Sequence, residues 1–142
     1  PDVVLCPDKD HDYHPDHIRT GQLVWDTHVM ATVRNIPTEH VPTDRIHEIW
    51  YCDTLAGIDS HPEFYVDVTD HWETKAKLIE CHESQSAWLI DQYGKPPTYY
   101  AETQTRFRGY QAGTTFAEGF RRSRTFPSSI AREGLLPASP CV

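Results

Sequence analysis

The segment DHDYHPDH, residues 10–17, organises the predicted fold, and it places three histidines and three aspartates within eight residues. An apolar run, VVLC at residues 3–6, precedes it and predicts a strand that is buried on both faces. Pro15 suits the first position of a helix, because its missing N–H would have no intrahelical partner there. The segment therefore joins a strand end to a helix start, which is where open α/β sheets place their chemistry.

Metal binding is the first chemistry that this segment suggests. Neutral imidazole and carboxylate groups suit zinc and its neighbours, and a catalytic zinc takes three protein ligands and leaves a position for water. The alternative is a solvated polar loop, but the sharp helix start at Pro15 would fix where the neighbouring histidines point. His28 would lie roughly 16 Å from His17 along the same helix, so the two histidines are not expected to share a metal.

Length and charge narrow the class of protein. The 142 residues suffice for one modest domain, and the net charge of -8 disfavours a general nucleic-acid-binding role. No apolar run is long enough to span a bilayer, and the start of the sequence carries no signal-peptide pattern. The four cysteines form no CxxC pair, which favours reduced thiols and a cytoplasmic location.

The rest of the chain alternates between predicted strands and helices. Apolar spacing predicts five further elements, which are helix 15–34, strand 46–52, strand 64–69, helix 71–93 and helix 99–109. The helix over 71–93 is expected to begin at a capping box formed by Asp70 and Glu73. Residues 116–120 predict only a short compact segment, and residues 127–142 are rich in Pro, Ser and Ala and predict a tail. This alternation is typical of an α/β fold.

Two further groups of polar residues are candidates for a functional role. Asp53 follows strand 46–52, and in a parallel sheet it would open on the same side as the histidine segment. It is therefore a candidate substrate-binding residue, with a turn residue before Gly57 as the alternative. The sequence His-Glu-Ser-Gln at residues 82–85 is polar where the buried stripe of the long helix should continue. These residues could line a site, but a structural role is favoured.

Three motifs in this order resemble the C-terminal half of the LmbE/PIG-L family of zinc-dependent N-deacetylases. They are His-Pro-Asp-His at residues 14–17, His-Glu-Ser-Gln at residues 82–85, and Phe-Ala-Glu-Gly-Phe at residues 116–120. The resemblance runs from Val3 to about Arg124. It implies a Rossmann-like layered sheet with flanking helices, in which residues 1–126 form the C-terminal part of the deacetylase domain and residues 127–142 form the tail.

The resemblance also implies roles for three residues of the histidine segment. His17 would be a ligand of Zn²⁺, and His14 would stabilise the tetrahedral oxyanion or protonate the leaving amine. Asp16 would orient these histidines. The resemblance assigns nothing to His11 or Asp12. The implied reaction removes an acetyl group from an N-acetylglucosamine-type sugar conjugate, using water that the metal activates.

The chain lacks one motif of the family, and this determines what is expected to complete the site. The family takes two more zinc ligands and its general base from an N-terminal His-Pro-Asp-Asp motif, which this chain lacks, since His61-Pro62 is followed by Glu63. An N-terminal segment or a second chain is therefore expected to complete the site. The alternatives are a non-catalytic half-domain that binds metal or a partner, and a metal-dependent phosphoesterase. A homo-oligomer is also expected, because four tryptophans cannot all be central in so small a core and family members commonly self-assemble.

Overall fold

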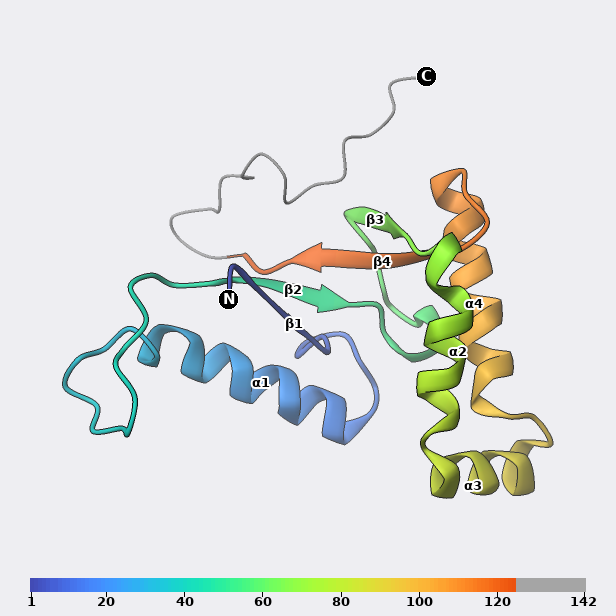
Figure 1. Cartoon of the computed structure of the whole chain (residues 1–142), viewed down its shortest axis with the longest axis horizontal. Helices are drawn as coiled ribbons and strands as arrows, with labels where there is room; N and C mark the ends of the chain where they lie inside the picture. The colour runs from blue at the N-terminus through green and yellow to red at the C-terminus, as the bar shows by residue number, and fades with distance from the viewer. Residues whose placement is uncertain (125–142) are drawn as a thin grey trace.

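A mixed four-stranded sheet forms the centre of the computed structural model, which describes residues 1–124 (Figure 1). The strand order is β1-β2-β4-β3. β1 is parallel to β2, whereas β4 is antiparallel to both of its neighbours. The strands are β1 (Val3–Cys6), β2 (Glu48–Cys52), β3 (Phe64–Asp67) and β4 (Ala117–Arg122). The α/β class predicted from the sequence is confirmed.

Helices flank the sheet in two groups (Figure 1). The helices are α1 (Pro15–Met30), α2 (Trp72–Glu80), α3 (Glu83–Tyr93) and α4 (Pro97–Ala112), with short 3-10 turns η1 (Leu55–Gly57) and η2 (Thr69–His71). α1 runs beside β1 and β2, whereas α2, α3 and α4 gather at the other end of the molecule. Within residues 1–124, no helix is long and apolar enough to cross a membrane.

The two faces of β2 carry separate parts of the core, because successive side chains of a strand point to opposite faces. On one face, Ile49 and Tyr51 pack with Cys6, and α1 covers them. On the other face, Trp50 meets the ring of Phe64 at 4.7 Å between centroids. β2 therefore contributes to both parts of the core. One of its faces packs against α1, and the other packs against the aromatic residues of β3 and β4.

Two predictions about strands are corrected. Residues 116–120 were expected to form only a compact segment, but β4 lies inside the sheet, between β2 and β3. Gly119 permits this arrangement, since a Cβ there would lie 2.5 Å from the Pro62 side chain. β1 was expected to be buried on both faces, yet Leu5 is 57% exposed, and β1 forms an edge of the described sheet.

The predicted long helix over 71–93 is two helices, α2 and α3. The capping box is absent, because Asp70 lies in η2 and α2 begins after His71 without a side-chain cap. The break falls at Cys81 and His82, so residues 82–85 are exposed at a helix start and do not face the core. α3 ends at Gly94, whose φ of 70° is the left-handed conformation that favours glycine.

α4 packs against the sheet through small and polar residues and not through its aromatic residues. Its buried residues are Thr105, Arg108 and Gly109. Gly109 lets the helix approach closely, since a Cβ there would lie 2.6 Å from the Thr115 carbonyl oxygen. Aromatic residues of this helix are exposed, among them Tyr100, Phe107 and Tyr110.

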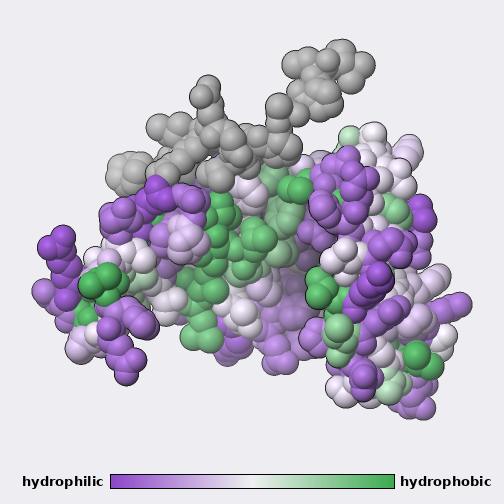
Figure 2. All heavy atoms as spheres, in the orientation of Figure 1, coloured by the Kyte–Doolittle hydropathy of each residue, from purple (hydrophilic) through white to green (hydrophobic). Residues whose placement is uncertain are grey.

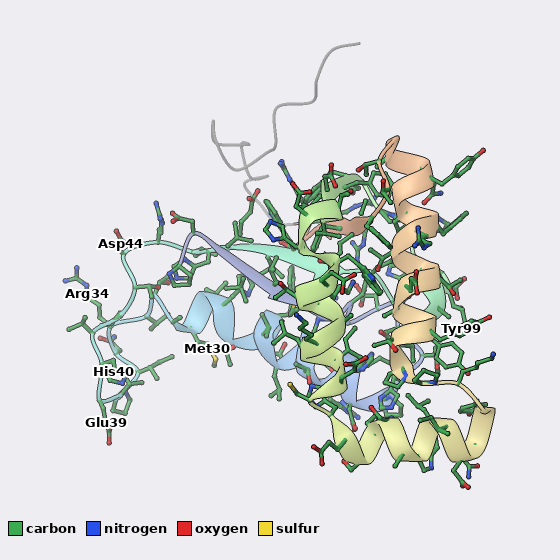
Figure 3. All side chains as sticks on the ribbon, turned by 45° about the vertical axis from the view of Figure 1, so that its right-hand side comes forward. Met30, Arg34, Glu39, His40, Asp44 and Tyr99 are labelled. Atoms are coloured by element: carbon green, nitrogen blue, oxygen red, sulfur yellow. The ribbon has the colours of Figure 1, made fainter. Side chains whose placement is uncertain are left out.

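The connection from α1 to β2 extends away from the α2–α4 helices (Figure 3). The side chains of Arg34, Glu39, His40 and Asp44 lie along this connection, and His40 is exposed. α1 ends at Met30. The predicted tail, residues 127–142, and the domain boundary at residue 126 lie outside the described residues.

Candidate functional site

The turn between β1 and α1 is anchored to the sheet through Asp8. The Asp8 carboxylate accepts a hydrogen bond from Arg121 of β4 at 2.7 Å and one from the Asp10 backbone N–H at 2.9 Å. Burial alone would raise the pKa of Asp8, but these hydrogen bonds outweigh it and hold the pKa below its ordinary value. The ion pair therefore fixes the start of the histidine segment to β4.

Gly21 fixes the same turn from the side of the helix. A Cβ at Gly21 would lie 2.4 Å from the Pro7 carbonyl oxygen and 3.0 Å from the Lys9 backbone nitrogen. Only glycine leaves enough room for this approach. α1 and the turn before it therefore pack backbone against backbone, which sets where the first residues of the helix lie.

Asp12 holds the two histidines that the sequence singled out. Its Oδ1 accepts the backbone N–H of His14 at 2.8 Å, and its Oδ2 lies 2.9 Å from His17 Nδ1. The Asp12 side chain is only 2% exposed, whereas that of His17 is 38% exposed. The imidazole of His17 is thus fixed on its buried side and open to solvent elsewhere.

His14 is the N-cap of α1, and Pro15 takes the first helical position as predicted. The Nδ1 atom of His14 accepts the backbone N–H of Asp16 at 3.3 Å. The rings of His14 and His17 are stacked, with 4.6 Å between their centroids. The structure therefore confirms that the segment places these two imidazoles together at a helix start.

In their neutral forms, the two imidazoles would take opposite tautomers to satisfy these hydrogen bonds. His14 accepts a hydrogen bond through Nδ1, so its proton is on Nε2, where it can be donated. His17 donates through Nδ1 to Asp12, so its Nε2 keeps a lone pair. The stacked pair therefore presents one hydrogen-bond donor and one potential metal ligand.

His17 fits the role of a zinc ligand. Metal-binding histidines usually donate their second ring N–H to a carboxylate or carbonyl, and the contact with Asp12 has this form. Another cluster, Asp8, Asp10 and His11, has ligand atoms within 4.8 Å of one another. Its Asp8 already binds Arg121, and its Asp10 binds Lys9 at 2.8 Å. The chemistry of the donors therefore favours His17 as a residue that could supply one of the three ligands that a catalytic zinc takes.

Asp12 is the residue that the sequence analysis missed, and Asp16 occupies a different place from the one expected. The Asp16 side chain is exposed, and its link to His14 runs through its backbone N–H. Asp12 lies two residues before His14, and aspartate commonly accepts a backbone N–H two residues later in a turn. That spacing was the available signal.

Asp53 follows β2, at the same edge of the sheet as the histidine segment. Its carboxylate accepts two hydrogen bonds from Arg108, at 2.6 and 2.9 Å. Burial opposes ionisation, but the hydrogen bonds from Arg108 lower the pKa of Asp53 below its ordinary value. The observed contact joins α4 to the end of β2. Substrate binding by Asp53 stays a prediction.

No known family profile matches the chain. The chain is 27% identical over 135 residues to a diacetylchitobiose deacetylase from Thermococcus kodakarensis, covering 85% of this chain and 45% of that protein. Its structure is similar to N,N'-diacetylchitobiose deacetylase from Pyrococcus horikoshii, with a TM-score of 0.67, 29% identity, and coverage of 87% of this chain and 46% of that one.

A conserved protein from Thermus thermophilus shares the fold, with a TM-score of 0.66, 23% identity, and coverage of 92% of this chain and 57% of that one. The chain spans about half the length of the relatives that it matches.

Proposed function

We propose that this chain is the histidine-bearing part of a zinc-dependent N-deacetylase of the LmbE/PIG-L type, which acts on N-acetylglucosamine-type sugars. The observation that carries the proposal is the stacked pair His14 and His17, in which one ring offers a donor and the other a lone pair. The likeness to two diacetylchitobiose deacetylases supports the reaction and the class of substrate.

The chemistry of amide hydrolysis divides between the metal and the protein. Zinc, when bound, supplies a nucleophile at neutral pH by making water more acidic. His17 would hold the ion through Nε2, with Asp12 fixing the ring from the other side. A general base and the remaining ligands would come from the completing segment.

His14 would stabilise the charge that develops on the acetyl carbonyl oxygen. Its Nε2–H is free to donate, and the positive end of α1 lies at the same place. Of the two roles considered for His14, this hydrogen-bond donor role is favoured. As a proton donor, His14 would also use Nε2, because Nδ1 is engaged by the Asp16 backbone N–H. Asp16 supports either role by orienting the ring.

A further segment, in the same chain or in another, would add the missing ligands beside β1. Two observations support this part of the proposal. Leu5 of β1 is 57% exposed at an edge of the described sheet. Figure 2 also shows hydrophobic atoms gathered in the middle of one face, between α1 and the α2–α4 helices. Apolar surface of this kind is commonly covered by another element or chain.

Self-association of the protein is a separate proposal. It is supported by exposed aromatic side chains on α3 and α4, which are Trp88, Tyr93, Tyr99, Phe107 and Tyr110. Light scattering on a size-exclusion column would show it, and a monomer at high concentration would contradict it.

The test of the function uses the protein together with its completing segment. Zinc content and release of acetate from N,N'-diacetylchitobiose would be measured for the wild type, His17→Ala, His14→Ala and the control His28→Ala. His28 packs against Trp25 on α1 and should be dispensable for both readouts.

We expect His17→Ala to lose zinc and activity together. We expect His14→Ala to keep its zinc but to lose about 10²- to 10³-fold in kcat, as removal of an oxyanion donor does. Activity that survives in His17→Ala would overturn the proposal. Release of phosphate from a sugar phosphate without any acetate release would point instead to a phosphoesterase, and inactivity on both would point to a non-catalytic module.

A further inference from the structure

Asp12 is the most enclosed carboxylate at the histidine pair. Each of its oxygens faces one donor, the His14 backbone N–H at 2.8 Å and His17 Nδ1 at 2.9 Å. The Asp16 side chain is exposed, and Asp10 pairs with Lys9 on the surface. Asp12 is therefore the side chain through which the backbone of one histidine and the ring of the other are fixed together.

The two donors leave Asp12 little freedom. A backbone N–H can only donate, so Oδ1 has to accept from His14. A carboxylate oxygen can only accept, so Oδ2 requires a proton on His17 Nδ1. In the neutral ring, the lone pair is then confined to Nε2. Because the Asp12 side chain is 2% exposed, water does not readily replace either contact.

We propose that Asp12 is the positioning residue that selects the tautomer of His17, so that the metal-binding lone pair is on Nε2 before any metal arrives. The metal-binding part of this inference rests on the proposed function of His17, whereas the tautomer does not. Asp12 thereby links His17 to His14, because the carboxylate that orients the His17 ring also holds the turn that places His14.

The isosteric variant Asp12→Asn makes a sharp test, because an amide has only one oxygen. If that oxygen continues to accept from the His14 N–H, the amide NH₂ must face His17 Nδ1. The NH₂ can only donate, so Nδ1 of His17 would have to accept and the ring proton would move to Nε2. Nε2 would then have no lone pair for a metal. We therefore expect a switch of tautomer and not merely a weaker contact.

The experiment is ¹H–¹⁵N NMR of the imidazole rings in the full 142-residue chain without metal, at a pH of about 8, where free imidazole is neutral. We expect a protonated Nδ1 for His17 in the wild type and a protonated Nε2 in Asp12→Asn. Asp10→Asn is the matched control, since it removes the same charge from an exposed neighbour, and it should leave His17 unchanged. A wild-type ring that is protonated on Nε2 overturns the inference, whether or not the variant folds.

A zinc titration of the protein together with its completing segment, followed on the same signals, separates this inference from the proposed function. We expect zinc to bind Asp12→Asn about 10- to 100-fold more weakly than the wild type, the usual cost of losing an outer partner of a ligand. Equal affinities would overturn the role of Asp12 in metal binding. If zinc perturbed His17 in neither protein, the proposed function would fail, while the tautomers would still decide the inference.

Discussion

Two neighbouring strands end in an acidic turn, and the two turns have different uses. β1 and β2 run parallel and pair directly, so both turns open at the same edge of the sheet. After β1, the buried Asp12 meets the imidazole of His17. After β2, the half-buried Asp53 meets the guanidinium of Arg108. A carboxylate at a strand end is therefore not enough to make a functional site, because the partner of that carboxylate decides its use.

The two partners differ in what they leave free. Arg108 forms two hydrogen bonds with Asp53 and is itself 6% exposed, so the pair is closed to other groups. His17 uses one ring nitrogen for Asp12 and keeps the other, and its side chain is 38% exposed. An arginine–aspartate pair therefore fastens a helix to a sheet, whereas a histidine–aspartate pair orients a group that can still bind.

Breaking the closed pair should give the largest effect. Arg108→Ala removes the charged partner of the half-buried Asp53 carboxylate, and we expect a loss of about 3–5 kcal/mol in the free energy of unfolding. Urea denaturation measures it. The control is Glu102→Ala on the same helix, which removes only the exposed pair with Arg106 and should cost about 0–1 kcal/mol. Equal losses in the two variants would mean that the Asp53 pair is not a structural fastening.

The pH dependence of stability tests the closed pair in a second way. Burial alone would raise the pKa of Asp53, but the hydrogen bonds from Arg108 outweigh burial and lower this pKa in the folded state. The contribution of Asp53 to stability is therefore complete above the ordinary aspartate pKa of about 4, and it is lost as the pH falls through the lower folded value.

We expect Asp53→Asn to be less stable than the wild type at neutral pH and to lose stability less steeply below about pH 4. Urea midpoints measured across the acid range would show this. Asp91→Asn, at an exposed position of α3, should keep the wild-type slope. An unchanged slope in Asp53→Asn would contradict the pairing.

The smallest perturbation uses two cysteines at the ends of the same strands. Burial raises the pKa of the Cys6 thiol at the end of β1 and of the Cys52 thiol at the end of β2, each to about 11. We therefore expect iodoacetamide at neutral pH to modify the exposed Cys81 well before either of them. Peptide mass spectrometry would give the rate for each thiol.

In Arg108→Ala, the protection of Cys52 should fall more than that of Cys6, because only the turn after β2 loses its fastening. Equal acceleration of both thiols would show that the two strand ends open together, and that the two turns are not independent.

Local sequence patterns were sufficient for some elements and insufficient for others. The short apolar run of β1 and the proline at the start of α1 carry their own signals, so both positions were predicted correctly. β4 carries a glycine and ends in two arginines, and its place in the sheet depends on contacts with β2 and β3 that are distant in sequence. Tertiary contacts of this kind override local propensity.

The candidate site shows the same division. His14 and His17 were found because residue type and spacing bring them to one helix start. Asp12 was missed because the sequence does not reveal which aspartate is buried. In the sequence alone, the buried Asp12 and the exposed Asp16 cannot be distinguished. The partner of Asp53 could not be predicted either, since Arg108 lies 55 residues away in the sequence.

The close approach at Gly21 has a consequence for protein engineering. The histidine segment cannot be grafted onto another scaffold as the residues 10–17 alone, because the backbone just before it, at Pro7 and Lys9, rests on the helix at Gly21. A transplanted unit would have to extend from Pro7 to Gly21. The receiving scaffold would also need a cation at the place of Arg121 to meet Asp8. The smallest portable form of this chemistry is thus a turn, two turns of helix beyond His14 and one basic residue from a distant strand.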